Sequence, residues 1–231
     1  MPSKPSLSLP ANLDAVVFDL DGTLIDSEPD LRAALNKLFT EVGRRAVGRD
    51  EVVMMVGDGV PKLVERAFRA TGGLPEGGLE APTARFLEIY EAAPADLSEP
   101  FPGAVDILEG LTAAGARLGV CTNKPAVPTR EILDHFGLAG YFGAVIGGDS
   151  LPGIRKPDPR PLAALLEALD TTPEKAVMVG DSANDVKTAK ALNVPAIAVS
   201  FGYSRGPVAD LQADMVIDRF DELWEVLPRL A

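Results

Sequence analysis

The sequence has little of several residue types, and each scarcity excludes a class of protein. Among its 231 residues is a single cysteine, Cys121, which excludes a disulfide framework and a cysteine-rich zinc site. It also suits a reducing, cytoplasmic compartment. The single histidine, His135, excludes a mechanism that needs two histidine ligands or bases. No apolar run reaches the roughly 18 residues of a membrane span.

Positive charge is scarce as well, with 22 Lys and Arg against 34 Asp and Glu, for a formal net charge of −12. Because clustered Lys and Arg hold nucleic-acid phosphates and anionic lipid surfaces, we expect neither a nucleic-acid nor a membrane partner. The 46% hydrophobic and 24% charged residues are typical of a globular protein. Residues 1–12, with several Pro and Ser, predict a disordered tail and not a signal peptide.

Short apolar runs separated by helical patterns predict the fold class. Such runs, rich in Val and Ile and without alternation, are typical of strands buried on both faces of a parallel sheet. The alternation with helices indicates an α/β protein whose Rossmann-like parallel sheet is flanked by helices. The expected strands are 15–18, 117–121, 144–146, 176–179, 196–199 and 215–217. The expected helices between the later strands are 104–114, 129–136, 161–169 and 183–192.

The first run is followed by roughly 70 to 80 residues without a convincing strand, which is far longer than an ordinary connection. This stretch contains three helical patterns, at 31–42, 60–70 and 84–92. We therefore expect an all-helical domain, residues 26–99, inserted into an α/β core. The core comprises residues 13–25 and 100–231, and two linkers near 24–29 and 93–102 join it to the insert.

Polar side chains follow four of the expected strands, where an open α/β sheet binds its ligands. Crowded carboxylates repel one another unless a cation holds them, and oxygen ligands without His or Cys favour Mg²⁺ over Zn²⁺. A lysine and a magnesium ion among hydroxyl and amide donors suit a phosphoryl group, and a carboxylate is then the natural nucleophile, giving an aspartyl-phosphate. The residues are Asp19, Asp21, Thr122, Asn123, Lys156, Asp181 and Asp185.

These residues resemble, in order, all four motifs of the haloacid dehalogenase superfamily. The motifs are the run DLDGTLIDS at 19–27, Thr122, Lys156 and the run GDSAND at 180–185. The resemblance extends from about residue 15 to 218, and the helical insert resembles that superfamily's cap domain.

The resemblance implies a role for each core residue. Asp19 attacks phosphorus, and Asp21 protonates the leaving alkoxide and then activates the water that cleaves the phosphoenzyme. An Asp at this second position separates the superfamily's phosphotransferases from its dehalogenases. Thr122 and Asn123 bind the transferring oxygens, and Lys156 neutralises charge between nucleophile and phosphate.

The resemblance also implies the metal site. Asp19, the backbone carbonyl of Asp21 and Asp181 would ligate Mg²⁺, and Asp185 would hold a metal-bound water.

Within the expected cap, residues 56–67 resemble a segment of phosphoglycolate phosphatases. Gly57 and Gly59 would permit a tight turn whose amides, with a helix N-terminus, receive an anion. Lys62 or Arg66 could pair with a substrate carboxylate. A plain turn and a solvated helix face would give the same pattern.

The resemblance implies a Mg²⁺-dependent phosphatase that hydrolyses a small phosphate monoester, with 2-phosphoglycolate first among the candidates. Asp58 stands where those phosphatases usually have Asn, and a carboxylate there suits an anionic substrate poorly. The alternatives are another sugar-phosphate or pyrophosphate hydrolase, or a phosphosugar mutase of the same superfamily. A phospho-acceptor signalling module would place similar residues around Mg²⁺, although receiver domains are shorter and lack a cap. Substrate identity and oligomeric state stay open at this level.

Overall fold

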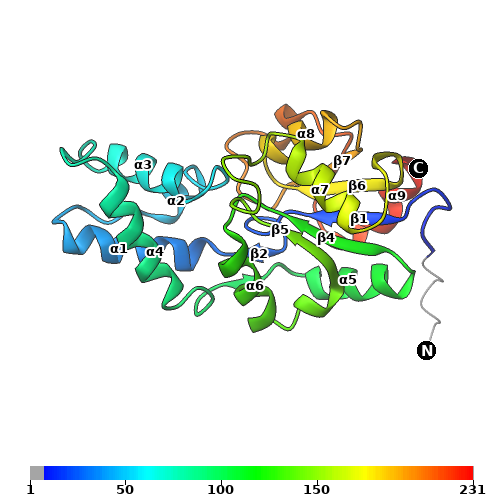
Figure 1. The fold of residues 1–231 in the computed structure, drawn as a ribbon, viewed down its shortest axis with the longest axis horizontal. Helices are drawn as coiled ribbons and strands as arrows, with labels where there is room; N and C mark the ends of the chain where they lie inside the picture. The colour runs from blue at the N-terminus through cyan, green and yellow to red at the C-terminus, as the bar shows by residue number, and fades with distance from the viewer. Residues whose placement is uncertain (1–7, 231) are drawn as a thin grey trace.

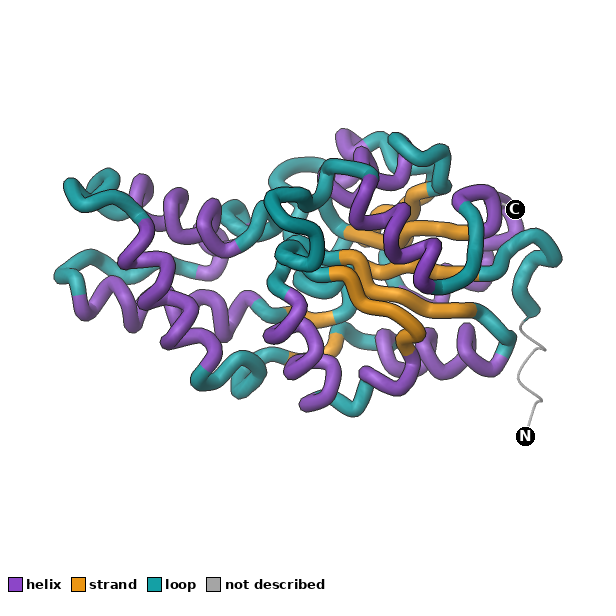
Figure 2. The backbone as a smooth tube through the Cα atoms, viewed as in Figure 1, coloured by secondary structure: helices purple, strands orange, loops and turns teal. Residues whose placement is uncertain are grey.

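A six-stranded, fully parallel sheet forms the centre of the larger part of the molecule (Figures 1 and 2). The computed structural model describes residues 8–230, so most of the expected tail lies outside the described residues. The strand order is β5-β4-β1-β6-β7-β8. The strands are β1 (Ala15–Phe18), β4 (Arg117–Cys121), β5 (Phe142–Ile146), β6 (Ala176–Gly180), β7 (Ala196–Val199) and β8 (Met215–Ile217). All six overlap the predicted apolar runs, with β5 beginning two residues earlier and β6 ending one residue later, which confirms the α/β class.

Helices cover both faces of this sheet, and the alternation of side chains along β1 shows why. Val16 and Phe18 face the core built with α5, α6 and α9, whereas Ala15 and Val17 face the core built with α7 and α8. These helices are α5 (Ala104–Ala113), α6 (Ala126–His135), α7 (Arg160–Ala168), α8 (Ala183–Lys190) and α9 (Leu223–Leu230). Short 3₁₀ turns are η1 (Ala139–Tyr141), η2 (Pro173–Lys175), η3 (Val208–Leu211) and η4 (Phe220–Glu222).

The strand order predicts a crevice at the carboxyl end of β1. The chain adds β4 and β5 on one side of β1 and then crosses to add β6, β7 and β8 on the other side. Loops that leave neighbouring strands in opposite directions open a crevice at such a switch point. The loops after β1, β4 and β6 therefore meet there.

A second, all-helical body extends from one end of the core (Figure 1). Its helices are α1 (Glu28–Glu41), α2 (Arg49–Val53), α3 (Val60–Ala70) and α4 (Glu80–Glu91). They surround a hydrophobic cluster of their own, in which Phe39 and Phe68 pack edge to face with ring centroids 5.3 Å apart. The short helix α2 is absent from the sequence-based expectation because five residues carry too little periodicity. None of the helices within residues 8–230 is long and apolar enough to span a bilayer.

The two linkers lie side by side as a short antiparallel ribbon, β2 (Ile25–Asp26) with β3 (Glu99–Pro100). This corrects the expectation of a stretch without strands, since two residues are too few to form a pattern. The Asp30 carboxylate reinforces the ribbon by accepting hydrogen bonds from the amides of Leu97 and Ser98, at 3.1 and 2.7 Å. Both linkers are thus joined where the helical body, called the cap below, meets the core.

Candidate active site

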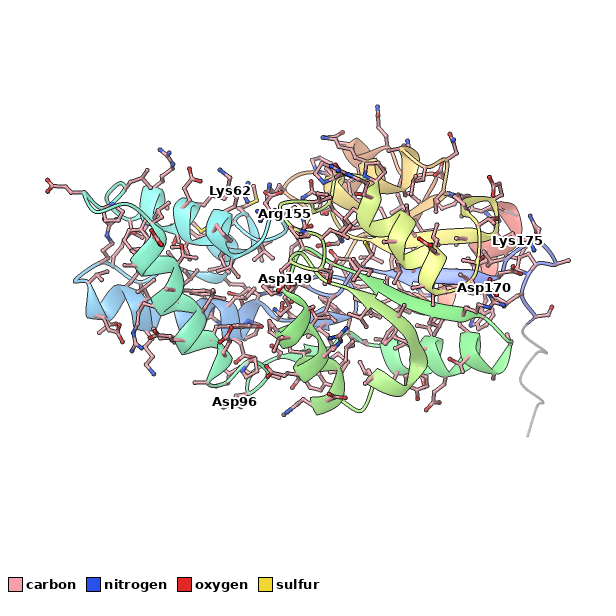
Figure 3. The ribbon with its side chains drawn as sticks, viewed as in Figure 1. Lys62, Asp96, Asp149, Arg155, Asp170 and Lys175 are labelled. Atoms are coloured by element: carbon pink, nitrogen blue, oxygen red, sulfur yellow. The ribbon has the colours of Figure 1, made fainter. Side chains whose placement is uncertain are left out.

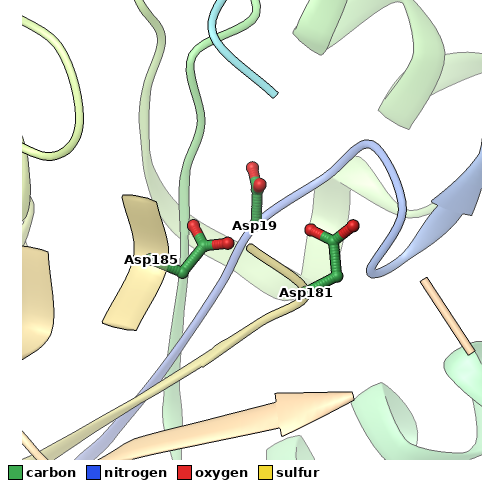
Figure 4. Close-up of side chains that lie close together, drawn as sticks. All are labelled: Asp19, Asp181 and Asp185. Carbon is green, nitrogen blue, oxygen red and sulfur yellow. The ribbon is translucent and has the colours of Figure 1, made fainter. Parts of the chain in front are cut away.

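Three buried carboxylates meet at the carboxyl end of the sheet (Figure 4). Asp19 directly follows β1, Asp181 directly follows β6, and Asp185 lies in the first turn of α8. One oxygen from each lies within 4.8 Å of the others. Burial raises the pKa of Asp19 to about 6, although Lys156 opposes the shift. Burial and the neighbouring Asp185 and Asp19 also raise the pKa of Asp181. Such an all-oxygen, electrostatically strained cluster fits a hard divalent cation.

Lys156 is the counter-ion within this cluster. Its buried Nζ lies 3.0 Å from Asp19 Oδ1 and 2.5 Å from Asp185 Oδ1, and it donates to the Cys121 carbonyl at 2.6 Å. Burial alone would lower the pKa of Lys156, but Asp185 and Asp19 outweigh it and raise the pKa. Asp185 also accepts hydrogen bonds from the Ser182 amide and hydroxyl, at 2.9 and 2.6 Å. Lys156 is therefore held as an ammonium group beside the Asp19 carboxylate.

The turn after β1 requires glycine. Gly22 has a φ of +82°, and a Cβ there would lie 2.3 Å from Oδ2 of Asp181. The same Oδ2 accepts a hydrogen bond of 2.6 Å from the amide of Tyr203. The Gly in the first motif thus lets the Asp19–Asp21 turn approach Asp181 closely.

Asp21 has a partner that the sequence did not reveal. Lys124 Nζ lies 3.1 and 3.2 Å from the two Asp21 oxygens and donates to the Tyr90 hydroxyl at 2.7 Å. The side chain of Lys124 is 4% exposed, and that of Asp21 is 14% exposed. Burial opposes protonation of Lys124, but Asp21 and Tyr90 raise its pKa above the usual value. The sequence did contain a clue to this pair, because Lys124 directly follows the motif residue Thr122 and its neighbour Asn123. The clue was missed because lysines are mostly surface residues.

These residues open into a small cavity between core and cap, with a volume of about 40 Å³. Its polar lining includes Thr122 and Asn123. The Asn123 amide nitrogen donates to the carbonyls of Gly57 and Lys156, both at 3.0 Å, so this side chain also connects the core to a cap loop. The lining is Asp19, Asp21, Leu31, Val56, Gly57, Gly59, Val60, Leu63, Leu87, Tyr90, Thr122, Asn123, Lys124, Pro125 and Pro128.

The cap loop with Gly57 and Gly59 rests on the core. Both glycines have positive φ, +106° and +84°. Between them, Asp58 accepts hydrogen bonds from Asn184 and Arg205 of the core, both at 2.6 Å, and from Arg66 of the cap. Burial would raise the pKa of Asp58, but these donors outweigh it and lower the pKa to about 2. The Asp58 carboxylate is therefore neutralised by arginines and does not confront a substrate anion.

Lys62 and Arg66, the two expected carboxylate receptors, lie elsewhere. They line a separate, open depression with Arg155, and Figure 3 shows Lys62 beside Arg155 at the junction of cap and core. The Lys62 side chain is 55% exposed and pairs with Glu65 at 2.8 Å. Arg66 is occupied by Asp58 and by the Met55 carbonyl, the latter at 2.8 Å. In this arrangement neither side chain faces the small cavity.

Comparison with known proteins agrees with the motifs and the fold. A model of the haloacid dehalogenase-like hydrolases matches residues 13–193, and the chain belongs to this family. The chain is 47% identical over 218 residues to a phosphoglycolate phosphatase of Rhodospirillum rubrum, covering 92% of this chain and 90% of that protein. A phosphoglycolate phosphatase of Caulobacter vibrioides is 45% identical over 207 residues, covering 89% and 86%.

Two crystal structures show the same architecture. A predicted phosphoglycolate phosphatase from Haemophilus somnus 129PT matches with a TM-score of 0.88 at 30% identity, covering 94% of this chain and 98% of the other. CbbY from Rhodobacter sphaeroides, in complex with phosphate, matches with a TM-score of 0.77 at 28% identity, covering 91% and 96%. The chain is thus an enzyme of the phosphoric monoester hydrolase class, similar to phosphoglycolate phosphatases.

Proposed function

We propose that this chain hydrolyses 2-phosphoglycolate to glycolate and phosphate, with Mg²⁺ as cofactor and an aspartyl-phosphate on Asp19 as intermediate. The observation that carries the proposal is a small cavity lined by two carboxylates, each of which is paired with a buried lysine. Asp19 lies 3.0 Å from Lys156, and Asp21 lies 3.1 Å from Lys124. Asp19, beside the Lys156 ammonium group, would act as the nucleophile, and Asp21, on the same cavity wall, would carry the proton.

In the first step a carboxylate oxygen of Asp19 forms a bond to phosphorus, and the bond from phosphorus to the ester oxygen breaks. The leaving alkoxide takes a proton from the Asp21 carboxyl group. The Lys156 ammonium group supports attack because it offsets charge on Asp19 and on the approaching phosphoryl oxygens. The Thr122 side chain lines the same cavity and supplies a hydroxyl donor to those oxygens.

In the second step Asp21 removes a proton from water, whose oxygen bonds to phosphorus while the bond to Asp19 breaks. Inorganic phosphate leaves, and Asp19 is regenerated as a carboxylate. The cap supports this division of labour, because its residues line one side of the cavity and limit access of bulk water while the phosphoenzyme forms.

The metal site proposed for Mg²⁺ consists of Asp19, the Asp21 carbonyl and Asp181, with Asp185 beside it. Bound there, the cation would supply Lewis-acid stabilisation of the phosphoryl oxygens. The support within the chain is the three-carboxylate cluster and the raised pKa values of Asp19 and Asp181. Asp185 keeps its place through Lys156 and Ser182.

Cavity size supports a small substrate. Pockets for drug-sized ligands typically enclose about 300–1,000 Å³, whereas this cavity encloses about 40 Å³. The walls contributed by Leu31, Leu63 and Leu87 offer few partners for the hydroxyl groups of a sugar. The relatives named phosphoglycolate phosphatase support the same choice.

The test is phosphate release from a panel of esters, compared by kcat/KM. The panel contains 2-phosphoglycolate, glucose 6-phosphate, pyrophosphate and a nucleoside monophosphate. We expect the highest value for 2-phosphoglycolate, dependence on Mg²⁺, and no turnover in Asp19→Asn. A preference for another ester would reject the substrate, and full activity of Asp19→Asn would reject the covalent mechanism. A phosphoenzyme that persists for hours would favour the signalling module instead.

A further inference from the structure

The small cavity contains a cation to which the reaction steps described above assign no role. Among the described residues that line the cavity, Lys124 is the one with a positively charged side chain. Lys156 lies deeper, where Asp19, Asp185 and the Cys121 carbonyl surround its Nζ. The charge that faces the alcohol portion of a substrate is therefore that of Lys124.

We propose that Lys124 binds the carboxylate of the substrate and so selects phosphate esters whose alcohol portion carries a negative charge close to the ester oxygen. This inference rests on the proposed function and assigns its specificity to one side chain. It differs from the sequence-based expectation, which gave that role to Lys62 or Arg66.

The position of Lys124 follows from its contacts. An ammonium group has three donors, and Lys124 directs them toward the two Asp21 oxygens, at 3.1 and 3.2 Å, and the Tyr90 hydroxyl. A substrate carboxylate would take the donor of one Asp21 oxygen, while the other oxygen keeps its hydrogen bond. The leaving oxygen must lie within hydrogen-bond distance of Asp21. Nζ is 3.1 Å from Asp21, so a carboxylate one carbon beyond that oxygen lies within reach of Nζ.

The surroundings make this cation selective. Apolar residues, including Val56, Val60 and Pro128, form much of the cavity wall. A carboxylate buried against such a wall without a partner is strongly unfavourable, whereas a carboxylate paired with a buried ammonium group is stabilised. An ester without the charge would gain nothing from Lys124, which would keep its hydrogen bonds to Asp21 and Tyr90.

The cap takes part through Tyr90 of α4. Its hydroxyl accepts from Lys124 at 2.7 Å and donates to the Pro94 carbonyl in the second linker at 3.2 Å. Its ring stacks on Phe86, with centroids 5.9 Å apart. Tyr90 is thus a positioning residue that holds Nζ in the cavity when cap and core are in contact.

The test compares 2-phosphoglycolate with ethyl phosphate, in which a methyl group replaces the carboxylate. For each variant the ratio of the two kcat/KM values is measured on one preparation, so a reduced folded fraction cancels. We expect Lys124→Met to lower this ratio by about 30-fold or more, Lys124→Arg to retain part of it, and Tyr90→Phe to lower it less. Lys37→Met, which removes an exposed lysine of α1, should leave the ratio unchanged.

Each contrary result has its own meaning. If the wild type prefers 2-phosphoglycolate and Lys124→Met slows both esters equally, Lys124 acts only on Asp21 and the inference is wrong. If the ratio instead falls in Lys62→Met, the carboxylate receptor is Lys62 and the inference is again wrong. A wild type that hydrolyses ethyl phosphate as well as 2-phosphoglycolate would contradict the proposed function itself, because no carboxylate is then selected.

Discussion

Replacing Asp58 by Asn should weaken the contact between cap and core while leaving the catalytic carboxylates in place. Asp58 lies in the cap loop, and its carboxylate accepts hydrogen bonds from Asn184 and Arg205 of the core, both at 2.6 Å. Asn keeps an oxygen that can accept from Asn184 but removes the charge that pairs with Arg205. The third donor, Arg66, belongs to the cap itself, so its pairing with Asp58 does not resist opening.

The free energy that the Asp58–Arg205 pair contributes can be gauged from the exposure of the two side chains. The side chains of Asp58 and Arg205 are 25% and 38% exposed. A fully exposed ion pair contributes about 0.2–1 kcal/mol, and a hydrogen bond to a buried charged group contributes about 1.5–3 kcal/mol. For this half-buried pair we expect about 1 kcal/mol, which corresponds to roughly a fivefold change in the ratio of closed to open molecules.

Hydrogen exchange of the contacting segments measures this ratio directly. In Asp58→Asn, amides in residues 56–60 and 201–205 should exchange about fivefold faster, whereas the sheet should be unchanged. Glu76→Gln, which removes an exposed charge elsewhere in the cap, is the control. Unchanged exchange in both segments, or an equal increase in the control, would refute the reasoning.

The contact between cap and core should weaken at acid pH, because Asp58 stabilises it as a carboxylate. The pKa of Asp58 is lowered to about 2, so its stabilising contribution is present above the ordinary value of 3.8 and is lost as the pH falls toward 2. Wild-type exchange in residues 56–60, corrected for its intrinsic pH dependence, should therefore rise below pH 4, and Asp58→Asn should lack this rise.

Three further outcomes follow from the site. Burial raises the pKa of Asp19 to about 6. Without metal, the contribution of Asp19 to the stability of the fold is therefore present below pH 3.8 and is lost as the pH rises through 6. Mg²⁺ should consequently raise Tm more at pH 7.5 than at pH 5.0, and equal shifts would contradict this. Gly22→Ala should lower kcat at least about tenfold, because its Cβ meets Asp181; Gly43→Ala, at φ +68° in open space, should keep kcat. Burial raises the pKa of the Cys121 thiol to about 12, so a disulfide reagent should label it only after unfolding, and rapid native labelling would disprove this.

The strands and most helices were predictable because they depend on local pattern. The strand β1 (Ala15–Phe18) is apolar at every position because both its faces are covered, and a single sequence shows that directly. Helix α4 begins at Glu80, four residues earlier than expected, because its first turn is largely exposed and carries no apolar periodicity. The pairing of β2 with β3 joins residues more than seventy positions apart, and no local pattern reveals such a contact.

The candidate site also contains residues that local sequence motifs indicate and contacts that only the three-dimensional structure reveals. Asp19 and Lys156 belong to motifs with a fixed order along the chain, so both could be selected as candidate site residues from the sequence. The pairing of Lys124 with Tyr90, and that of Asp58 with Arg205, depend on how the cap rests on the core. From the sequence alone, the Asp58 carboxylate conflicted with an anionic substrate. The structure removes the conflict, because Arg66 and Arg205 donate hydrogen bonds to this carboxylate.

The charge of the site implies an order of binding. Four carboxylates against two ammonium groups leave a formal charge of −2 when all are ionised, and the groups are Asp19, Asp21, Asp181, Asp185, Lys124 and Lys156. A phosphate monoester adds about two further negative charges at neutral pH, so the empty site repels its own substrate. One divalent cation brings the site to neutrality. The acidic balance of the sequence is thus repeated at the site, where it makes the proposed Mg²⁺ a precondition for substrate binding.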